Sequence, residues 1–165
     1  PQEIPNHMFG GLSAGEDRMT NAGHRGIPQI VAPGCYDLVD YVGWQPTPAQ
    51  FTDRPTHAHN RLLTSAVLTA EERRAVAREI CGKLGEAEGP VTLLLPRGGC
   101  NEWDRPGADL HDAEGLAAFC DEIVACCPAN VRLQEMAAHI NDAAFAEAAL
   151  AVFDAWVEEG MIPRP

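Results

Sequence analysis

The chain contains a short apolar run at residues 91–95 (VTLLL), which lies between a Gly-Pro pair and a proline. A strand with no polar face must be covered on both sides. Parallel sheets meet this requirement, because the helices that connect their strands lie on both faces. Residues 28–32 and 131–136 have a similar character and predict two more strands. Since helical patterns alternate with these segments, we expect a three-layer Rossmann-like α/β domain with a mostly parallel sheet and helices on both faces.

Two capping boxes predict where helices begin. Thr69 and Glu72 have the spacing at which a hydroxyl and a carboxylate satisfy the free amides of a helix N-terminus. Ser13 and Glu16 have the same spacing and predict a helix over residues 15–22. Behind Thr69, apolar residues recur with a helical period and are expected to be buried: Val76, Ala77, Ile80, Cys81 and Leu84.

Two more helices are expected towards the C-terminal end, capped by Asp112 and by Asn141 or Asp142. Residues 2–9 also have a helical pattern, although an α/β unit usually opens with a strand. We therefore expect residues 1–165 to form a single α/β domain that corresponds to one half of a longer protein. The predicted buried faces of the two C-terminal helices are Leu116, Phe119, Cys120, Ile123 and Val124, and Phe145, Ala149, Val152, Phe153 and Trp156.

The composition limits the classes of partner. The chain has 165 residues, a formal net charge of −12 and a pI of about 4.8. An acidic surface repels phosphate backbones, so direct nucleic-acid binding is not expected. No apolar stretch approaches the roughly 20 residues that span a bilayer, so no membrane partner is expected. The six cysteines include no CxxC pair, which favours reduced thiols and a cytoplasmic protein.

Polar residues gather where the predicted strands end. Ligands of open α/β sheets bind beyond the carboxyl ends of the strands. The loops at residues 33–37, 96–101 and 139–142 are therefore expected to form one site. Ordinary turn and helix-capping chemistry is the alternative interpretation, because glycine, proline, asparagine and aspartate are also typical of turns.

Within these loops, Cys100 follows two glycines at a strand end, where we expect it to be open to solvent. It is a candidate nucleophile with His139 or His59 as its base, although an unreactive loop thiol is the alternative. Arg97 is a candidate clamp for a phosphate or carboxylate, since its planar fork matches both. The remaining candidates here are Asp142 for catalysis and Gly34, Gly98, Gly99 and Asp104 for ligand binding.

Residues 9–15 (FGGLSAG) form a Gly-rich turn before the first capping box. Its backbone amides can approach an anion, which makes ligand-binding candidates of Gly10, Gly11, Ser13 and Gly15. A tight turn without a ligand is the alternative.

His57, His59 and Asn60 lie close together in a proline-rich segment. Their imidazoles suit a zinc or manganese ion, contact with a phosphate, or acid–base work. Surface histidines that bind nothing are the alternative.

Four segments of the chain together resemble one family: FGGLSAGEDRMTNAGHRGIPQIVAPGCYDLVDY, HAHN, LLLPRGGCNEWDRPGADLHD and AHINDAAFAEA. They are similar to the C-terminal half of the two-domain Tm-one-like ATP-binding proteins, which include a plant tobamovirus-resistance protein. The resemblance implies a second α/β half, a Rossmann-like N-terminal half and nucleotide binding. Its motif positions fall on residues 10–15, 57–60, 97–99 and 139–142, and on Asp104 and Gly107. The chain departs from the family after Asn60, where it reads RLLTSAV, and at Cys100, where serine is expected.

Three hypotheses about function follow. The first is a ligand-binding domain for a nucleotide, such as ATP with Mg, or for a small phosphorylated or carboxylated metabolite. The second is a hydrolase or lyase acting on a small carboxylated metabolite through Cys100, or through a metal held by His57, His59 and Asp112. The third is a structural domain for oligomerisation. The expected partners are a small anionic ligand, the N-terminal half of the same protein and a second copy of the chain.

Overall fold

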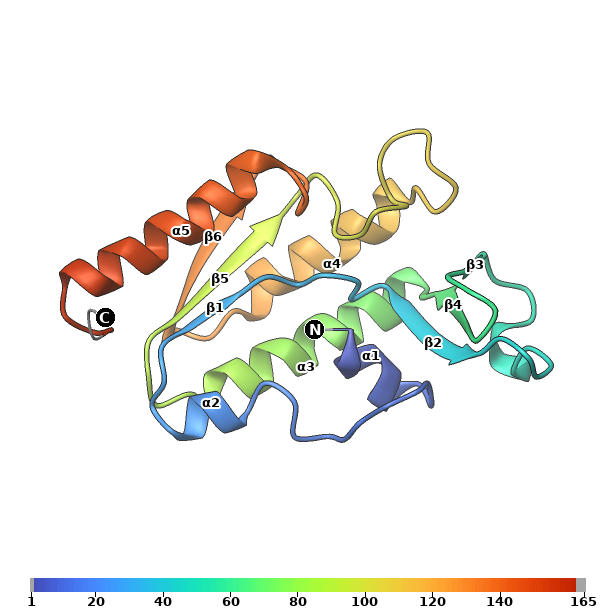
Figure 1. Ribbon diagram of the computed structural model, residues 1–165, viewed down its shortest axis with the longest axis horizontal. Helices are drawn as coiled ribbons and strands as arrows, with labels where there is room; N and C mark the ends of the chain where they lie inside the picture. Colours follow the sequence, from blue (N-terminus) through green and yellow to red (C-terminus); the bar gives the residue numbers. More distant parts are fainter. Residues whose placement is uncertain (1, 163–165) are drawn as a thin grey trace.

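The parallel sheet expected from the sequence lies towards one end of the molecule (Figure 1). The computed structural model describes residues 2–162. Three strands in the order β1-β5-β6 pair in parallel, and Val31, Leu93 and Leu133 lie side by side across them. The strands are β1 (Gln29–Val31), β5 (Val91–Pro96) and β6 (Val131–Met136). The predicted α/β class is confirmed.

Helices on both faces of this sheet give it three layers (Figure 1). Leu93 and Leu95 of β5 belong to the core shared with α3 and α4. Leu94, between them, packs with Phe145 and Trp156 of α5 on the opposite face. Both faces of β5 are therefore buried, which explains why its sequence is apolar throughout. The three helices are α3 (Ala70–Gly85), α4 (Ala113–Cys126) and α5 (Ala143–Glu158).

The helices around the parallel sheet begin where the sequence predicted, although Asp142, at the start of α5, makes no side-chain cap hydrogen bond. Thr69 caps α3 in a complete capping box with Glu72. Asp112 caps α4, and its carboxylate accepts a 2.8 Å hydrogen bond from the Gly115 amide. Each cap satisfies amides that would otherwise lack a partner at the helix N-terminus.

Two residues predicted to be buried are exposed instead. Val124 of α4 is 43% exposed and Phe153 of α5 is 44% exposed. The prediction was wrong because each helix buries only a narrow stripe: α4 packs against α3, and α5 covers a sheet of only three strands. On α5 that stripe consists of Phe145, Val152 and Trp156.

A second, antiparallel sheet was missed by the sequence analysis, which predicted strands only at residues 28–32, 91–95 and 131–136. Its strands have the order β2-β4-β3, with Asp40 opposite Ser65 and His57 also opposite Ser65. The chain enters it from β1, so this sheet extends from the end of the first (Figure 1). Its elements are β2 (Leu38–Val42), a short 3₁₀ helix (Ala49–Phe51), β3 (Thr56–Ala58) and β4 (Leu63–Val67).

The N-terminal region differs from the prediction in one element. The helical pattern of residues 2–9 is realised as α1 (Glu3–Met8), but no helix covers residues 15–22. Residues 14–20 are mostly turns and are followed by the four-residue α2 (Asn21–His24). The predicted capping box does not form: residues 16–20 are turns, the Ser13 hydroxyl oxygen accepts a 3.2 Å hydrogen bond from the Gly15 amide, and the hydroxyl donates a 2.7 Å hydrogen bond to Glu3. Among the described residues, no helix has both the length and the apolar character that a membrane crossing requires.

Candidate functional site

The three loops that follow the parallel strands lie against one another. The Cys35 amide donates a 3.0 Å hydrogen bond to the Cys100 carbonyl, which joins the first loop to the second. The Ile140 amide donates a 3.0 Å hydrogen bond to the Gly99 carbonyl, which joins the third loop to the second. Parallel strands end at a common edge, and this edge brings together the loops singled out in the sequence.

The polar side chains of these loops largely bind each other. Asp104 accepts hydrogen bonds from the Cys100 amide, from the Asn101 amide at 3.2 Å and from His139 Nε2 at 2.9 Å. Asp37 accepts a hydrogen bond from Asn101 Nδ2 at 3.0 Å. All five residues are buried, His139 and Cys100 to 2% exposure. The cluster therefore holds the loops together from inside the molecule.

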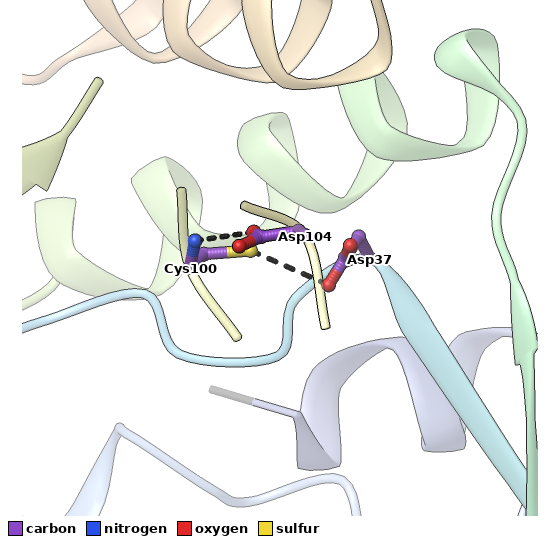
Figure 2. Close-up of side chains that lie close together, drawn as sticks. All are labelled: Asp37, Cys100 and Asp104. Atoms are coloured by element: carbon purple, nitrogen blue, oxygen red, sulfur yellow. Dashed lines mark hydrogen bonds between the residues drawn. The ribbon is translucent and has the colours of Figure 1, made fainter. Parts of the chain in front are cut away.

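Figure 2 shows the centre of this cluster, where the Cys100 thiol lies between Asp37 and Asp104. Its Sγ is 3.4 Å from Asp37 Oδ1. Burial, together with the Asp37 and Asp104 carboxylates, raises the pKa of the Cys100 thiol well above its ordinary value. The expectation that Cys100 is open to solvent was wrong, because the loop after β1 covers it. A buried, protonated thiol is a poor nucleophile.

The two glycines before Cys100 are in close contact with the third loop. A Cβ on Gly98 would lie 2.7 Å from the carbonyl carbon of Ala138 and from the amide nitrogen of His139. A Cβ on Gly99 would likewise lie only 2.5 Å from side-chain atoms of Asp104 and of His139. Gly34 of the first loop lies nearest to Ile140, and its position has room for a Cβ at an ordinary contact distance.

The charged candidates at the rim of these loops point towards other charges. Arg97 is ion-paired with Asp121 at 2.8 Å and with Glu135 at 2.6 Å, and these two bonds raise the pKa of its guanidinium. Asp142 accepts hydrogen bonds from the His139 amide at 2.9 Å and from Arg105 at 3.0 Å, which lower the pKa of its carboxyl. Both side chains already have partners that satisfy their charge.

A small hollow of about 140 Å³ lies where the loops after β1 and β5 meet β2 and β4. Trp103 forms part of the wall of this hollow. The Trp103 ring also contacts two imidazoles, with its centroid 4.0 Å from that of His57 and 5.8 Å from that of His59. Asn60 lies outside the hollow, where its Oδ1 accepts hydrogen bonds from the turn between β3 and β4. The lining residues are Gln2, Cys35, Leu38, Asp40, His59, Leu63, Ser65 and Trp103.

Asp40 is the residue that sequence reasoning missed most clearly. Its carboxylate is buried and accepts hydrogen bonds from Gln2 at 2.8 Å, Asn6 at 3.2 Å and Ser65 at 2.6 Å. Asn6 belongs to α1, Gln2 directly precedes this helix, and Ser65 lies in β4. Asp40 therefore connects the N-terminal helix to the second sheet. A signal was available in the sequence: an aspartate in the middle of the otherwise apolar LVDYV segment.

A larger hollow of about 610 Å³ shares Gln2 and Asp40 with the small one. We call the two together the paired hollows. Arg18 is the one basic side chain among the described residues that line the larger hollow. Its lining residues are Gln2, Glu3, Ile4, Asn6, Leu12, Arg18, Met19 and Asp40.

The Gly-rich turn borders the larger hollow and already binds a carboxylate. Glu3 Oε1 accepts hydrogen bonds from the Ser13 hydroxyl at 2.7 Å, the Ala14 amide and the Gly15 amide at 3.3 Å. The Ser13 hydrogen bond is the largest influence on the Glu3 carboxyl and lowers its pKa. The turn therefore stabilises a negative charge, as the sequence suggested, although the charge belongs to the protein itself.

The two glycines that open this turn have different surroundings. Gly10 has a φ of +74°, and no atom lies within 4 Å of the position a Cβ would take, so glycine is needed here for the bend of the chain. A Cβ on Gly11 would lie 2.7 Å from Val39 and 2.8 Å from the Asp40 carbonyl oxygen. Gly11 thus allows the turn to pack directly on β2.

The metal site expected from histidines is not assembled. Within residues 2–162, the one group of three potential ligands whose donor atoms lie within 4.8 Å of one another consists of Asp37, Cys100 and Asp104. Its oxygens already accept hydrogen bonds from Asn101 and from backbone amides. His57 and His59 contact Trp103 instead of joining Asp112. The residues present therefore do not fit the predicted His-bound metal.

Comparison with known proteins agrees with the resemblance seen in the sequence. The family model described as "Uncharacterised protein family (UPF0261) C-terminal domain" matches residues 1–157. A UPF0261 protein of Brucella melitensis is 51% identical over 164 residues, which are 99% of this chain and 39% of that protein.

More distant relatives include a plant protein. A UPF0261 protein of Rhizobium meliloti is 30% identical over 92% of this chain and 39% of its own length. The ToMV resistance protein Tm-1(GCR237) of Solanum lycopersicum is 30% identical over 88% of this chain and 20% of its own length. The chain thus spans about two fifths of the bacterial relatives. On this evidence the chain belongs to the UPF0261 family and represents its C-terminal domain.

Proposed function

We propose that this domain binds a small organic anion, either a nucleotide such as ATP with Mg or a carboxylated metabolite, in the paired hollows. The observation that carries the proposal is the Gly-rich turn, whose Ser13 hydroxyl and two amides converge on a carboxylate oxygen at the edge of the larger hollow. A turn that holds one anion has the donors needed to hold another. Arg18 adds a positive charge to the same hollow.

The smaller hollow indicates the size of the ligand. Its volume of about 140 Å³ is close to the ~150 Å³ of a cavity that holds one benzene ring. Its wall combines apolar side chains with the Trp103 ring and a few polar groups, a mixture that suits an organic ring bearing hydrogen-bonding groups. A ligand that reaches past Gln2 and Asp40 would place its ring here and its anionic group at the turn.

Calorimetric titration of the full-length protein tests this proposal. ATP with Mg and a panel of small carboxylic acids are the ligands, and we expect heat and a rise in Tm with at least one of them. Arg18→Ala is expected to weaken that binding on the order of tenfold, since it removes a charge from the larger hollow. Arg25→Ala is the matched control, because Arg25 is also exposed and lies outside the lining. No heat and no thermal shift with any of these ligands would overturn the proposal.

A further inference from the structure

The Glu3 carboxylate occupies the turn in the manner of a bound ligand. Three donors, the Ser13 hydroxyl and the amides of Ala14 and Gly15, converge on the single oxygen Oε1. Glu3 belongs to α1, whereas the donors lie ten to twelve residues further along the chain. The contact is therefore tertiary, and it brings a carboxylate from outside the turn into its donors.

The charges around this contact favour one class of anion over another. Among the described lining residues of the larger hollow, Arg18 is basic, whereas Glu3 and the buried Asp40 are acidic. A phosphate monoester, with a charge near −2 at neutral pH, would meet more repulsion here than a carboxylate with a charge of −1. Donors that converge on one oxygen also match a carboxylate more closely than the three terminal oxygens of a phosphate.

We propose that the ligand of the paired hollows carries a carboxylate that displaces Glu3 from Ser13, Ala14 and Gly15. This inference rests on the proposed function and narrows its ligand class. Glu3 then acts as an intramolecular competitor that fills the site when no ligand is bound. The exchange replaces one carboxylate with another, so the donors of the turn keep their hydrogen bonds throughout.

The competitor has a measurable effect on affinity. A ligand binds only to the fraction of molecules in which Glu3 has left the turn, so the apparent affinity is reduced by that fraction. Removing the Glu3 carboxylate leaves the turn always available. Glu3→Ala is therefore expected to bind a simple carboxylate about tenfold more tightly than the wild-type protein.

The experiment follows the Ala14 and Gly15 amide resonances of the full-length protein by ¹H–¹⁵N NMR. Sodium acetate and inorganic phosphate are titrated separately into the wild-type protein, Glu3→Ala and Glu3→Gln. Glu3→Gln keeps the shape of the side chain and serves if the alanine variant disturbs the turn. Glu88→Ala is the control for the loss of one negative charge, because Glu88 is exposed and lies outside both hollows.

The proposal is supported if acetate shifts both amides at lower concentration in the Glu3 variants than in wild-type and Glu88→Ala protein, and phosphate does so more weakly. It is overturned if neither amide responds to acetate in the Glu3 variants, or if all four proteins respond alike. An equal or stronger response to phosphate overturns the choice of carboxylate. Heat from ATP with Mg but from no carboxylic acid would likewise overturn this inference while leaving the proposed function intact.

Discussion

At the level of single residues, Gly98 is the position where the strand-end loops leave least room. A Cβ there would lie 2.7 Å from backbone atoms of Ala138 and His139, and backbone that is hydrogen-bonded within the loop cannot easily move away. We expect Gly98→Ala to lower the free energy of unfolding by about 2 kcal/mol or more. Urea denaturation followed by circular dichroism measures the change.

Gly82→Ala is the matched control for this substitution. Gly82 is exposed within α3, and no atom lies within 4 Å of the position of its Cβ. Alanine should therefore raise the free energy of unfolding by about 0.5–1 kcal/mol, because it restricts the unfolded chain more than glycine does. Equal stability of the two variants would show that the loops are not packed as tightly as the structure indicates.

Sequence reasoning placed Cys100, Asp104 and His139 at one edge of the sheet, because parallel strands necessarily end together. It did not show that these side chains face inward and bind one another. Whether a loop residue points towards solvent or towards the next loop depends on how the loops cross, which no local pattern records. Asp40 was missed for a related reason, since its partners lie 25 to 38 residues away.

At the level of elements, the start of α3 depends on a carboxylate with several partners. Burial alone would raise the pKa of Glu72, but hydrogen bonds from Arg54 and Thr69 outweigh it and lower the pKa below 4.5. A carboxyl whose pKa is lower in the folded state stabilises the fold above its unfolded pKa, and this stability is lost as the pH falls through the folded pKa. Glu72→Gln is therefore expected to cost about 1–2 kcal/mol near neutral pH.

The pH dependence separates this prediction from a simple loss of packing. The difference in unfolding free energy between wild type and Glu72→Gln should shrink as the pH falls from the ordinary glutamate pKa of 4.5 through the lowered pKa of folded Glu72, because wild-type Glu72 becomes neutral over this range as well. Glu79→Gln is a control on the same helix, where the half-exposed Glu79 pairs with Lys83 four residues on, an interaction worth only about a few tenths of a kcal/mol. A difference that stays constant from neutral to acidic pH would contradict the role given to the charge.

The predicted elements were right where one local signal dominated. A capping box located α3, a capping aspartate located α4, and short apolar segments located the parallel strands. The signal was strongest for β5, because burial on two faces requires a continuous apolar sequence. The antiparallel sheet was missed because its residues sit among prolines and glycines that are typical of loops. Ser13 and Glu16 misled the prediction, because a capping-box spacing does not reveal that the residues after Ser13 form turns and that Ser13 bonds to Gly15 and Glu3.

At the level of the whole molecule, the outer face of α5 points to a contact with other parts of the family's longer chain. Leu150 is 61% exposed and Phe153 is 44% exposed, and a spacing of three residues puts them on one side of the helix. The chain spans 39% of the length of its bacterial relatives, so most of each of those proteins has no counterpart in it. We expect that remainder, or a second copy, to cover these two side chains in the full-length protein.

Leu150→Asp tests this expectation in the full-length protein. If the face is covered, a buried aspartate without a partner should lower Tm by several degrees, an effect of roughly 2 kcal/mol. Ala151→Asp is the control: it adds the same charge to the same helix at an exposed position about 100° further around the axis. Light scattering on both variants shows which partner covers the face. If a second copy covers it, Leu150→Asp should lower the measured mass, whereas the loss of a contact within one chain leaves the mass unchanged. Equal Tm values for the two variants and the wild type would mean that α5 faces solvent in the full-length protein too.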